Sequence, residues 1–279
     1  MPQSILWALV IGAGACVGSF LNVCIHRLPR RQSIVAPRSF CPACGAPIAW
    51  YDNVPILSFL ALRGCCRNCR ARISVRYPLV EAATALLFGA LFQLRGPTLL
   101  FVADALLGAA LIALILIDAE HQILPNAITL PGIAAGILAS PLRPGIAGPG
   151  PAPALASLGA AAVAAALGYV IPLSVNASYR LWQALRGVPA ASREDGIGQG
   201  DFKLLAMIGA FLGVRLLLFC LFVGAVTGAA FGLVMIRYAG YGWKSKLPYG
   251  VFLGSAAILA LFVGDPTVDW YLRLTGIAR

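Results

Sequence analysis

The sequence has few charged residues. Of its 279 residues, 11% are Asp, Glu, Lys or Arg, whereas 60% are hydrophobic. A typical soluble domain is about 25% charged, and most of those charges face water. This composition excludes an ordinary soluble enzyme, a disordered chain and a disulfide-rich secreted miniprotein. A membrane protein with several spans is the class that remains.

Acidic residues are especially scarce. Asp and Glu number 10 against 21 Lys and Arg, which gives a net charge of +11. Such an excess suits a nucleic acid or another acidic partner, but it also suits cytoplasmic loops, which collect Lys and Arg. The positions of the charges along the chain must decide between these interpretations.

Apolar segments of roughly transmembrane length, about 20 residues, recur along the chain. The first contains no charge and no Lys or Arg precedes it, so it is not typical of a secretory signal peptide. We predict an all-α polytopic membrane protein with about eight transmembrane helices. The expected segments are 4–25, 77–94, 98–117, 123–142, 154–173, 202–214, 216–236 and 248–264.

The basic residues predict the topology. Arg27, Arg30 and Arg31 follow the first segment, which places the N-terminus outside and the next segment in the cytoplasm. With eight spans both termini lie outside, and 15 of the 21 basic residues then fall in cytoplasmic segments, Lys244 and Lys246 among them. We therefore interpret the positive charge as topology and expect no nucleic-acid partner.

Residues 26–76 form the one long polar stretch, and they contain nine arginines. The stretch also contains four paired cysteines, which favour a small folded insertion over a linker. We predict three parts: a first transmembrane helix over 1–25, a cytoplasmic insertion over 26–76 and a seven-helix membrane core over 77–279.

Two C-x-x-C pairs lie in this insertion, separated by 21 residues. Four thiolates at such spacing bind zinc tetrahedrally and leave no position for water, so we predict one structural zinc-ribbon-like site per chain. Two disulfides are the alternative, which a reducing cytoplasm disfavours. Cys65 could replace Cys66 as a ligand. The predicted ligands are Cys41, Cys44, Cys66 and Cys69.

Two aspartates stand at predicted helix ends on the cytoplasmic side. Asp118 ends the third segment and Asp201 precedes the sixth, where Gly198 and Gly200 would let a substrate backbone approach. Two close carboxyl groups do not easily ionise together, so one serves as general base for water and the other as general acid. Interfacial aspartates that only end a helix are the alternative, and His121 is a candidate titrating neighbour.

An ordered set of motifs runs over nearly the full length of the chain: Gly18 to Pro29, Cys41 to Cys44, Trp50 to Pro55, Cys66 to Cys69, Ser74 to Glu81, Asp118 with His121, Leu124 to Asn126, Gly198 to Leu204 and Pro248 to Gly250. This set resembles the type IV prepilin peptidases, which are bifunctional leader peptidases and N-methyltransferases of inner membranes. Phe202 stands where the family commonly has Val, and Tyr249 stands where it commonly has Phe.

This resemblance implies an aspartic protease with Asp118 and Asp201 as the catalytic pair. Gly198, Gly200 and His121 are the supporting residues that we predict from their positions beside the aspartates. It would cleave type IV prepilins or type II secretion pseudopilins after the leader's terminal Gly, at the cytoplasmic face of the bacterial inner membrane. The apolar segment that follows usually begins with Phe.

The resemblance also implies N-methylation of the new terminus with S-adenosylmethionine. The sequence has no G-x-G-x-x-G after a strand, so methylation rests on resemblance alone. The residues of a methyltransferase site stay unknown, with Asn22, Glu81 and the 26–76 insertion as loose candidates.

Two other classes of protein compete with this hypothesis. A proton-coupled transporter would use Asp104, Asp118 and Asp201 as a relay, but Asp118 and Asp201 are expected at one membrane face. A membrane-anchored zinc module that binds nucleic acid or protein would depend on the 26–76 insertion and dispense with the aspartates.

Overall fold

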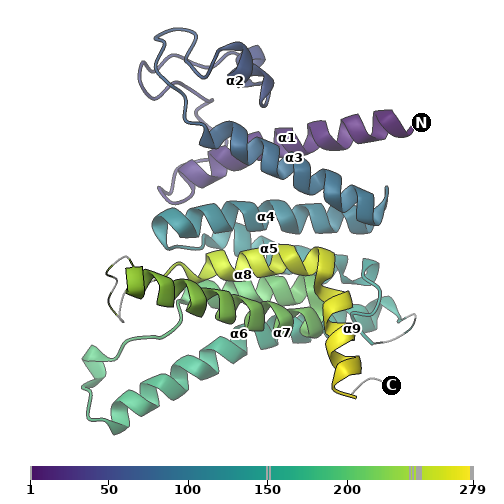
Figure 1. The fold of residues 1–279 in the computed structure, drawn as a ribbon, viewed down its shortest axis with the longest axis vertical. Helices are drawn as coiled ribbons and strands as arrows, with labels where there is room; N and C mark the ends of the chain where they lie inside the picture. The colour runs from purple at the N-terminus through teal and green to yellow at the C-terminus, as the bar shows by residue number, and fades with distance from the viewer. Residues whose placement is uncertain are drawn as a thin grey trace. The chain divides into compact units, whose positions relative to one another are not determined.

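The structure is a computed structural model that describes residues 2–148, 150, 152–238, 240, 242 and 247–276 (Figure 1). Lys244 and Lys246 lie outside these residues. The described chain is helical apart from two isolated β-bridges, which confirms the all-α class. It divides into two compact units, Met1–Ala113 and Leu114–Arg279. The three-part division made from the sequence stays a prediction.

The first unit is built on α1 (Gln3–Arg27), α3 (Arg76–Arg95) and the beginning of α4 (Leu99–His121). Two glycines let α1 pack closely on α3. A Cβ added to Gly14 would lie 2.8 Å from the Cα of Ala85, and one added to Gly18 would lie 2.6 Å from the Cα of Glu81. This four-residue spacing of small residues lets membrane helices bring their backbones together.

Between α1 and α3 the chain forms the polar insertion, with a 3₁₀ turn η1 (Trp50–Asn53) and a short helix α2 (Leu57–Ala61). Buried Arg27 stabilises its first part by donating to the carbonyls of Ser33, at 2.9 Å, and Pro37, at 2.8 Å. Because a buried guanidinium needs acceptors, these carbonyls fix the chain that leaves α1.

The second unit contains the remaining part of α4 and five further α-helices. Within it α7 packs against α5, α6 and α8, and its first part is almost wholly buried. The elements are α5 (Asn126–Ala139), η2 (Ser140–Leu142), α6 (Ala154–Leu185), η3 (Ala190–Ser192), α7 (Gln199–Tyr238), α8 (Tyr249–Leu259), η4 (Ala260–Gly264) and α9 (Asp265–Leu274).

Helix α7 has 40 residues, which at 1.5 Å per residue would span about 60 Å. A bilayer core is about 30 Å thick, so an unbroken helix would be twice as long as needed. Gly213 interrupts it with φ 79° and ψ 173°, a backbone conformation that favours glycine. The expected segments 202–214 and 216–236 are therefore the two parts of α7, divided at this glycine.

Six helices of the described chain are long and apolar enough to cross a membrane, and the protein is an integral membrane protein. Helix α5 is shorter than its expected segment 123–142, because Pro125 immediately precedes its first residue. The last expected segment continues through η4 into α9. The six are Gln3–Arg27, Arg76–Arg95, Leu99–His121, Ala154–Leu185, Gln199–Tyr238 and Tyr249–Leu274.

Candidate active site and metal site

Asp118 lies near the end of α4 and is 5% exposed. Its Oδ2 accepts the backbone N–H of Val251 at 3.1 Å, and the N–H of Gly250 also donates to this carboxylate. Pro248, the N-cap of α8, supplies no side-chain hydrogen bond. Since the first N–H groups of a helix have no partner within it, Asp118 serves as the cap of α8 from another helix.

Gly250 leaves room for this contact. A Cβ added at Gly250 would lie 2.9 Å from Oδ2 of Asp118 and 3.1 Å from Cδ1 of Leu124. Both distances are shorter than an ordinary van der Waals contact, and the neighbours are a packed leucine and the carboxylate itself. Glycine at this position therefore sets how closely α8 approaches Asp118.

Asp201 lies in the first turn of α7 and is 9% exposed. Its backbone N–H donates to the carbonyl of Gly198 at 3.1 Å, and the N–H of Gly198 donates to its carboxylate. The negative charge of Asp118 acts on this carboxyl group. The structure thus brings together two aspartates that stand 83 positions apart in the sequence (201 minus 118).

The two glycines that precede Asp201 lie in close contacts. A Cβ added to Gly198 would lie 3.2 Å from Oδ2 of Asp201, and one added to Gly200 would lie 3.0 Å from the Cβ of Leu124. Leu124 thus lies against Gly200 on one side and Gly250 on the other. The Leu124 side chain therefore contacts the first turn of α7, which contains Asp201, and the first turn of α8, whose N–H groups donate to Asp118.

His121 does not join the aspartates among the described interactions. Its Nε2 lies 3.9 Å from Oε2 of Glu120, and both side chains are partly exposed at the end of α4. Tyr249 lies beside the pair: the charge of Asp201 acts on its hydroxyl group, and it directly precedes Gly250, whose N–H donates to Asp118. In the sequence Tyr249 stood out only as a departure from the family pattern.

Two side-chain amides of α6 hold the segment that leads into α7. Asn176 donates to the carbonyl of Ile197 at 2.8 Å and accepts its N–H at 2.9 Å. Gln183 makes the same pair of bonds to Glu194, both at 3.1 Å. These residues were not predicted, although two amides seven positions apart in an apolar segment, and so on one face of a helix, were a signal in the sequence.

Cys41, Cys44, Cys66 and Cys69 form a cluster that could hold a metal ion. Their sulfur atoms all lie within 4.8 Å of one another, and those of Cys41 and Cys69 are 3.8 Å apart. Tetrahedral zinc with Zn–S bonds of about 2.3 Å separates its sulfurs by about 3.8 Å, so the cluster fits such an ion. None of the eight cysteines, all in the described part of the chain, forms a disulfide.

The two C-x-x-C turns share one backbone geometry. The N–H of Gly45 donates to the carbonyl of Cys41 at 2.8 Å, and the N–H of Arg70 donates to that of Cys66 at 3.0 Å. Gly45 and Arg70 both have positive φ, 72° and 59°. This register groups Cys66 with the cluster, while the sulfur of Cys65 lies 3.6 Å from the carbonyl oxygen of Arg63.

Hydrogen bonds within the cluster favour thiolates at two positions. The N–H of Ala46, with a further contribution from the Asn68 side chain, lowers the pKa of Cys44 to about 7. The N–H groups of Cys69 and Asn68 lower the pKa of Cys66. Because a metal binds the thiolate, these donors favour ligation through Cys44 and Cys66.

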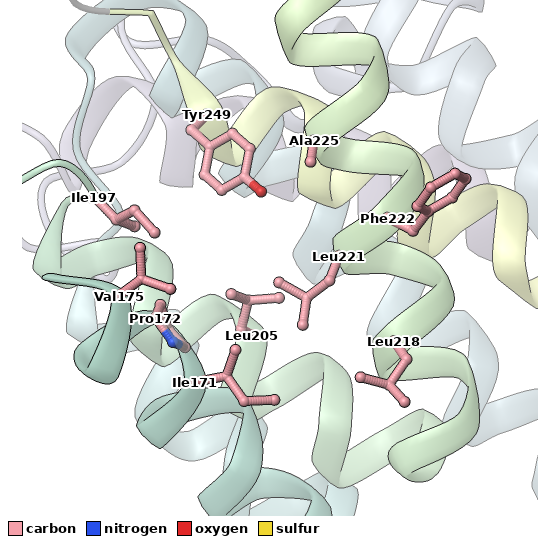
Figure 2. Close-up of a pocket in the computed structure, with 10 residues that line it drawn as sticks. All are labelled: Ile171, Pro172, Val175, Ile197, Leu205, Leu218, Leu221, Phe222, Ala225 and Tyr249. Carbon is pink, nitrogen blue, oxygen red and sulfur yellow. The ribbon is translucent and has the colours of Figure 1, made fainter. Parts of the chain in front are cut away.

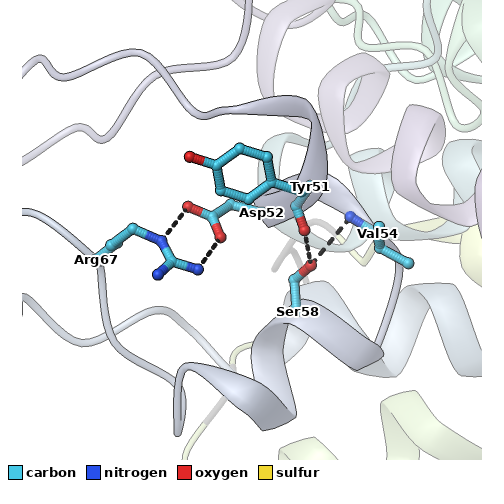
Figure 3. Close-up of polar contacts among 5 residues, drawn as sticks. All are labelled: Tyr51, Asp52, Val54, Ser58 and Arg67. Atoms are coloured by element: carbon cyan, nitrogen blue, oxygen red, sulfur yellow. Dashed lines mark hydrogen bonds and ion pairs between the residues drawn. The ribbon is translucent and has the colours of Figure 1, made fainter.

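An ion pair fastens the second C-x-x-C turn to η1 (Figure 3). Arg67 donates from Nε to Oδ2 of Asp52 at 2.8 Å and from its terminal nitrogen to Oδ1 at 2.6 Å. These bonds lower the pKa of Asp52. Ser58 completes the contact region by donating to the carbonyl of Tyr51 at 2.9 Å and accepting the N–H of Val54 at 3.1 Å.

Asn22 and Glu81, the loose candidates for a methyltransferase site, both make internal hydrogen bonds. Asn22 donates to the carbonyl of Tyr77 at 3.1 Å, and Glu81 accepts the N–H of Ile56 at 2.7 Å. Both side chains are buried. These contacts join α1 to α3 and α3 to the insertion within the first unit.

Two family models match the chain. The bacterial peptidase A24 N-terminal domain matches residues 13–94, and the type IV leader peptidase family matches residues 105–233. The boundary between the two models thus falls between residues 94 and 105, close to the division of the structure into units.

Curated proteins named prepilin leader peptidase/N-methyltransferase are similar over most of the chain. One from Burkholderia pseudomallei is 36% identical over 99% of this chain and 90% of its own. One from Pseudomonas aeruginosa is 36% identical over 94% and 92%, and one from Myxococcus xanthus is 44% identical over 81% and 62%. No solved structure matches. The chain belongs to the type IV leader peptidase family.

Proposed function

We propose that the protein is a membrane aspartic endopeptidase that removes the leader of type IV prepilins after Gly and then N-methylates the new terminus. The observation that carries this proposal is the pairing of Asp118, near the end of α4, with Asp201, in the first turn of α7, in a chain of this family. The names of the relatives, which state both activities, support it.

The pair of carboxyl groups has the composition that peptide hydrolysis needs. In one ionisation state a carboxylate takes a proton from water, whose oxygen attacks the carbonyl carbon of the scissile bond. The other carboxyl group donates its proton, and the amide nitrogen leaves as an amine once the C–N bond breaks. Backbone N–H groups of Gly198, Gly250 and Val251 orient the two carboxylates for this exchange.

The setting of the reaction follows the predicted topology. In this proposal the protein lies in the bacterial inner membrane with both termini outside and the aspartates at the cytoplasmic face. Its substrates are membrane-embedded prepilins, and the proposal extends to type II secretion pseudopilins. The apolar helices span the lipid bilayer. The basic loops mark its cytoplasmic side, so the proposal includes no nucleic-acid partner.

In the proposal a structural zinc ion is held by Cys41, Cys44, Cys66 and Cys69, one per chain. Four thiolate ligands leave no position for water, so the ion stabilises the insertion and takes no part in the reaction. Metal analysis should give about one zinc per chain. Full stoichiometry in a Cys41→Ser, Cys44→Ser double variant would refute this ligand set.

S-adenosylmethionine is the proposed methyl donor, and when bound it supplies an electrophilic methyl group to the new N-terminal amine. The names of the relatives carry this second activity, and we assign no residue to its site. Mass spectrometry of a cleaved prepilin incubated with S-adenosylmethionine should show a methyl-sized gain. Cleaved product of unchanged mass would leave a peptidase alone.

The peptidase assignment is tested with Asp118→Asn and Asp201→Asn in proteoliposomes. Each variant should lose cleavage of a full-length prepilin by at least about 1,000-fold, because each removes one of the two proton-transfer groups. Insertion into the membrane and metal content should be unchanged. Substantial cleavage by either variant would remove that aspartate from the catalytic pair.

A further inference from the structure

An apolar pocket of about 400 Å³ lies in the second unit (Figure 2). This volume falls within the range of known ligand pockets. Its walls come from α6, both parts of α7, the segment before α7 and the start of α8. The lining residues are Ile171, Pro172, Val175, Ile197, Leu205, Leu218, Leu221, Phe222, Ala225 and Tyr249.

The pocket begins beside the aspartates. Ile197 directly precedes Gly198, and Leu205 follows Asp201 by one helical turn, about 6 Å along α7. The Tyr249 side chain, on which the charge of Asp201 acts, directs its hydroxyl group toward the space that Leu205 and Leu221 line (Figure 2). The pocket therefore lies within reach of a polypeptide held at Asp201.

The pocket is accessible from the bilayer side of the helices. Leu205 is fully buried, whereas Leu218 and Phe222 are 51% and 71% exposed. Both exposed residues belong to α7, a membrane span, where exposed apolar side chains face lipid. An occupant would enter from the hydrocarbon region, which favours an apolar membrane segment or a lipid chain over a water-soluble molecule.

The polar group of the lining selects between these occupants. The Tyr249 hydroxyl is the single polar side-chain group among the lining residues. A peptide backbone offers carbonyl groups along its whole length that can accept from this partly buried hydroxyl, whereas the acyl chain of a lipid offers none below its ester group. We propose that the pocket seats apolar side chains from the first helical turns of the substrate's membrane segment, directly after the scissile bond. This inference rests on the proposed peptidase function.

The first test fills the pocket with Ala225→Trp and uses Val226→Trp, an exposed neighbour outside the lining, as the matched control. Cleavage of a full-length prepilin in proteoliposomes is compared with cleavage of a short peptide that lacks the membrane segment. Because the filled pocket can no longer bury an apolar side chain, the full-length substrate should lose at least about tenfold more kcat/KM than the peptide. Val226→Trp should leave that ratio at the wild-type value. An unchanged ratio in Ala225→Trp would overturn the proposal.

The second test measures contact without cleavage. A benzoylphenylalanine photocrosslinker replaces Phe222 in the Asp201→Asn variant, which is mixed with uncleaved prepilin in liposomes. Crosslinks to the first turns of the prepilin membrane segment support the proposal, and crosslinks to lipid or to the leader alone overturn it. If Asp201→Asn itself cleaves prepilin, the peptidase assignment to Asp201 fails. The first test, in which Ala225→Trp is made with Asp201 intact and the full-length prepilin is compared with the short peptide, then still decides the role of the pocket.

Discussion

The four-cysteine cluster and the aspartate pair are assembled in different ways. Each C-x-x-C turn is closed by hydrogen bonds between residues four or five positions apart, so its shape is local. The aspartates depend on contacts that join α4 to α8 and fasten the start of α7, separated by long stretches of chain. We therefore expect the cysteine cluster to depend on its proposed metal ion and the aspartate pair to depend on the packing of the helices.

Removal of the proposed metal ion is the strongest test of whether the two sites are assembled independently. If the proposed zinc ion holds the insertion, its binding free energy contributes directly to the folding of that segment, so chelation should unfold residues 38–73 almost completely. Hydrogen exchange should show lost protection there and retained protection in α4, α7 and α8. Loss of protection in those helices as well would contradict independent assembly of the two sites.

The pH dependence of metal retention should follow the thiols. Bound metal requires thiolates, and the pKa of Cys44 is about 7 whereas that of Cys69 is about 11. As pH falls below 7, protons compete at every ligand, and by mass action the affinity drops about tenfold per pH unit for each proton displaced. Zinc retention measured from pH 8 to pH 5 should fall steeply. A Cys65→Ser control should follow the wild-type curve.

A change in helix packing should damage the aspartate site without touching either carboxylate. In Gly250→Ala the added Cβ lies 2.9 Å from Oδ2 of Asp118, which forces α8 or the carboxylate to move. The contact must open by about 0.5 Å to reach an ordinary van der Waals distance, and a displacement of about 1 Å costs roughly 100-fold in rate, so prepilin cleavage should fall by about 10- to 100-fold. Gly12→Ala, where the Cβ meets nothing within 4 Å, is the matched control. Equal activity in both variants would show that Gly250 does not set the geometry.

The difference between the sites explains what the sequence could predict. The cysteine spacing predicted four sulfur atoms that lie together in the structure, and the similar turns at Gly45 and Arg70 group Cys66 with them; the identity of the metal ligands stays a prediction. The pairing of Asp118 and Asp201 came from their common membrane depth and the family resemblance. The donation from Val251 to Asp118 was not predictable, because a backbone N–H has no sequence signal until the helices are packed.

The two parts of α7 show a related limit. The hydrophobic pattern predicted the segments 202–214 and 216–236, and Gly213 divides the observed helix between them. The amides of Asn176 and Gln183 escaped prediction because their partners are backbone groups of a loop, whose course depends on tertiary structure. Hydropathy thus predicts which segments enter the membrane but not how loops are held.

A smaller loss is expected when these amides are removed. Asn176→Ala frees Ile197, which directly precedes Gly198 and lines the pocket, and should lower kcat/KM for prepilin about tenfold, because one hydrogen-bonded pair is lost. Gln183→Ala frees Glu194, which is farther from Asp201, and should have a weaker effect. A Gln183→Ala loss equal to or greater than that of Asn176→Ala would contradict this gradient.

The smallest expected effect is a gain at the cysteine cluster. Arg70 has φ 59°, a conformation that costs a side-chain-bearing residue about 1–2 kcal/mol and glycine almost nothing. Allowing for the greater entropy of unfolded glycine, Arg70→Gly should stabilise the turn by about 1 kcal/mol and tighten zinc binding about fivefold. Arg72→Gly is the control, since Arg72 pairs with Cys65 in a β-bridge and glycine should weaken binding there. Chelator competition measures the zinc affinity of both variants. A higher affinity in Arg70→Gly and a lower affinity in Arg72→Gly would show that local backbone conformation determines the strength of the cysteine site, as helix packing determines the geometry of the aspartate site.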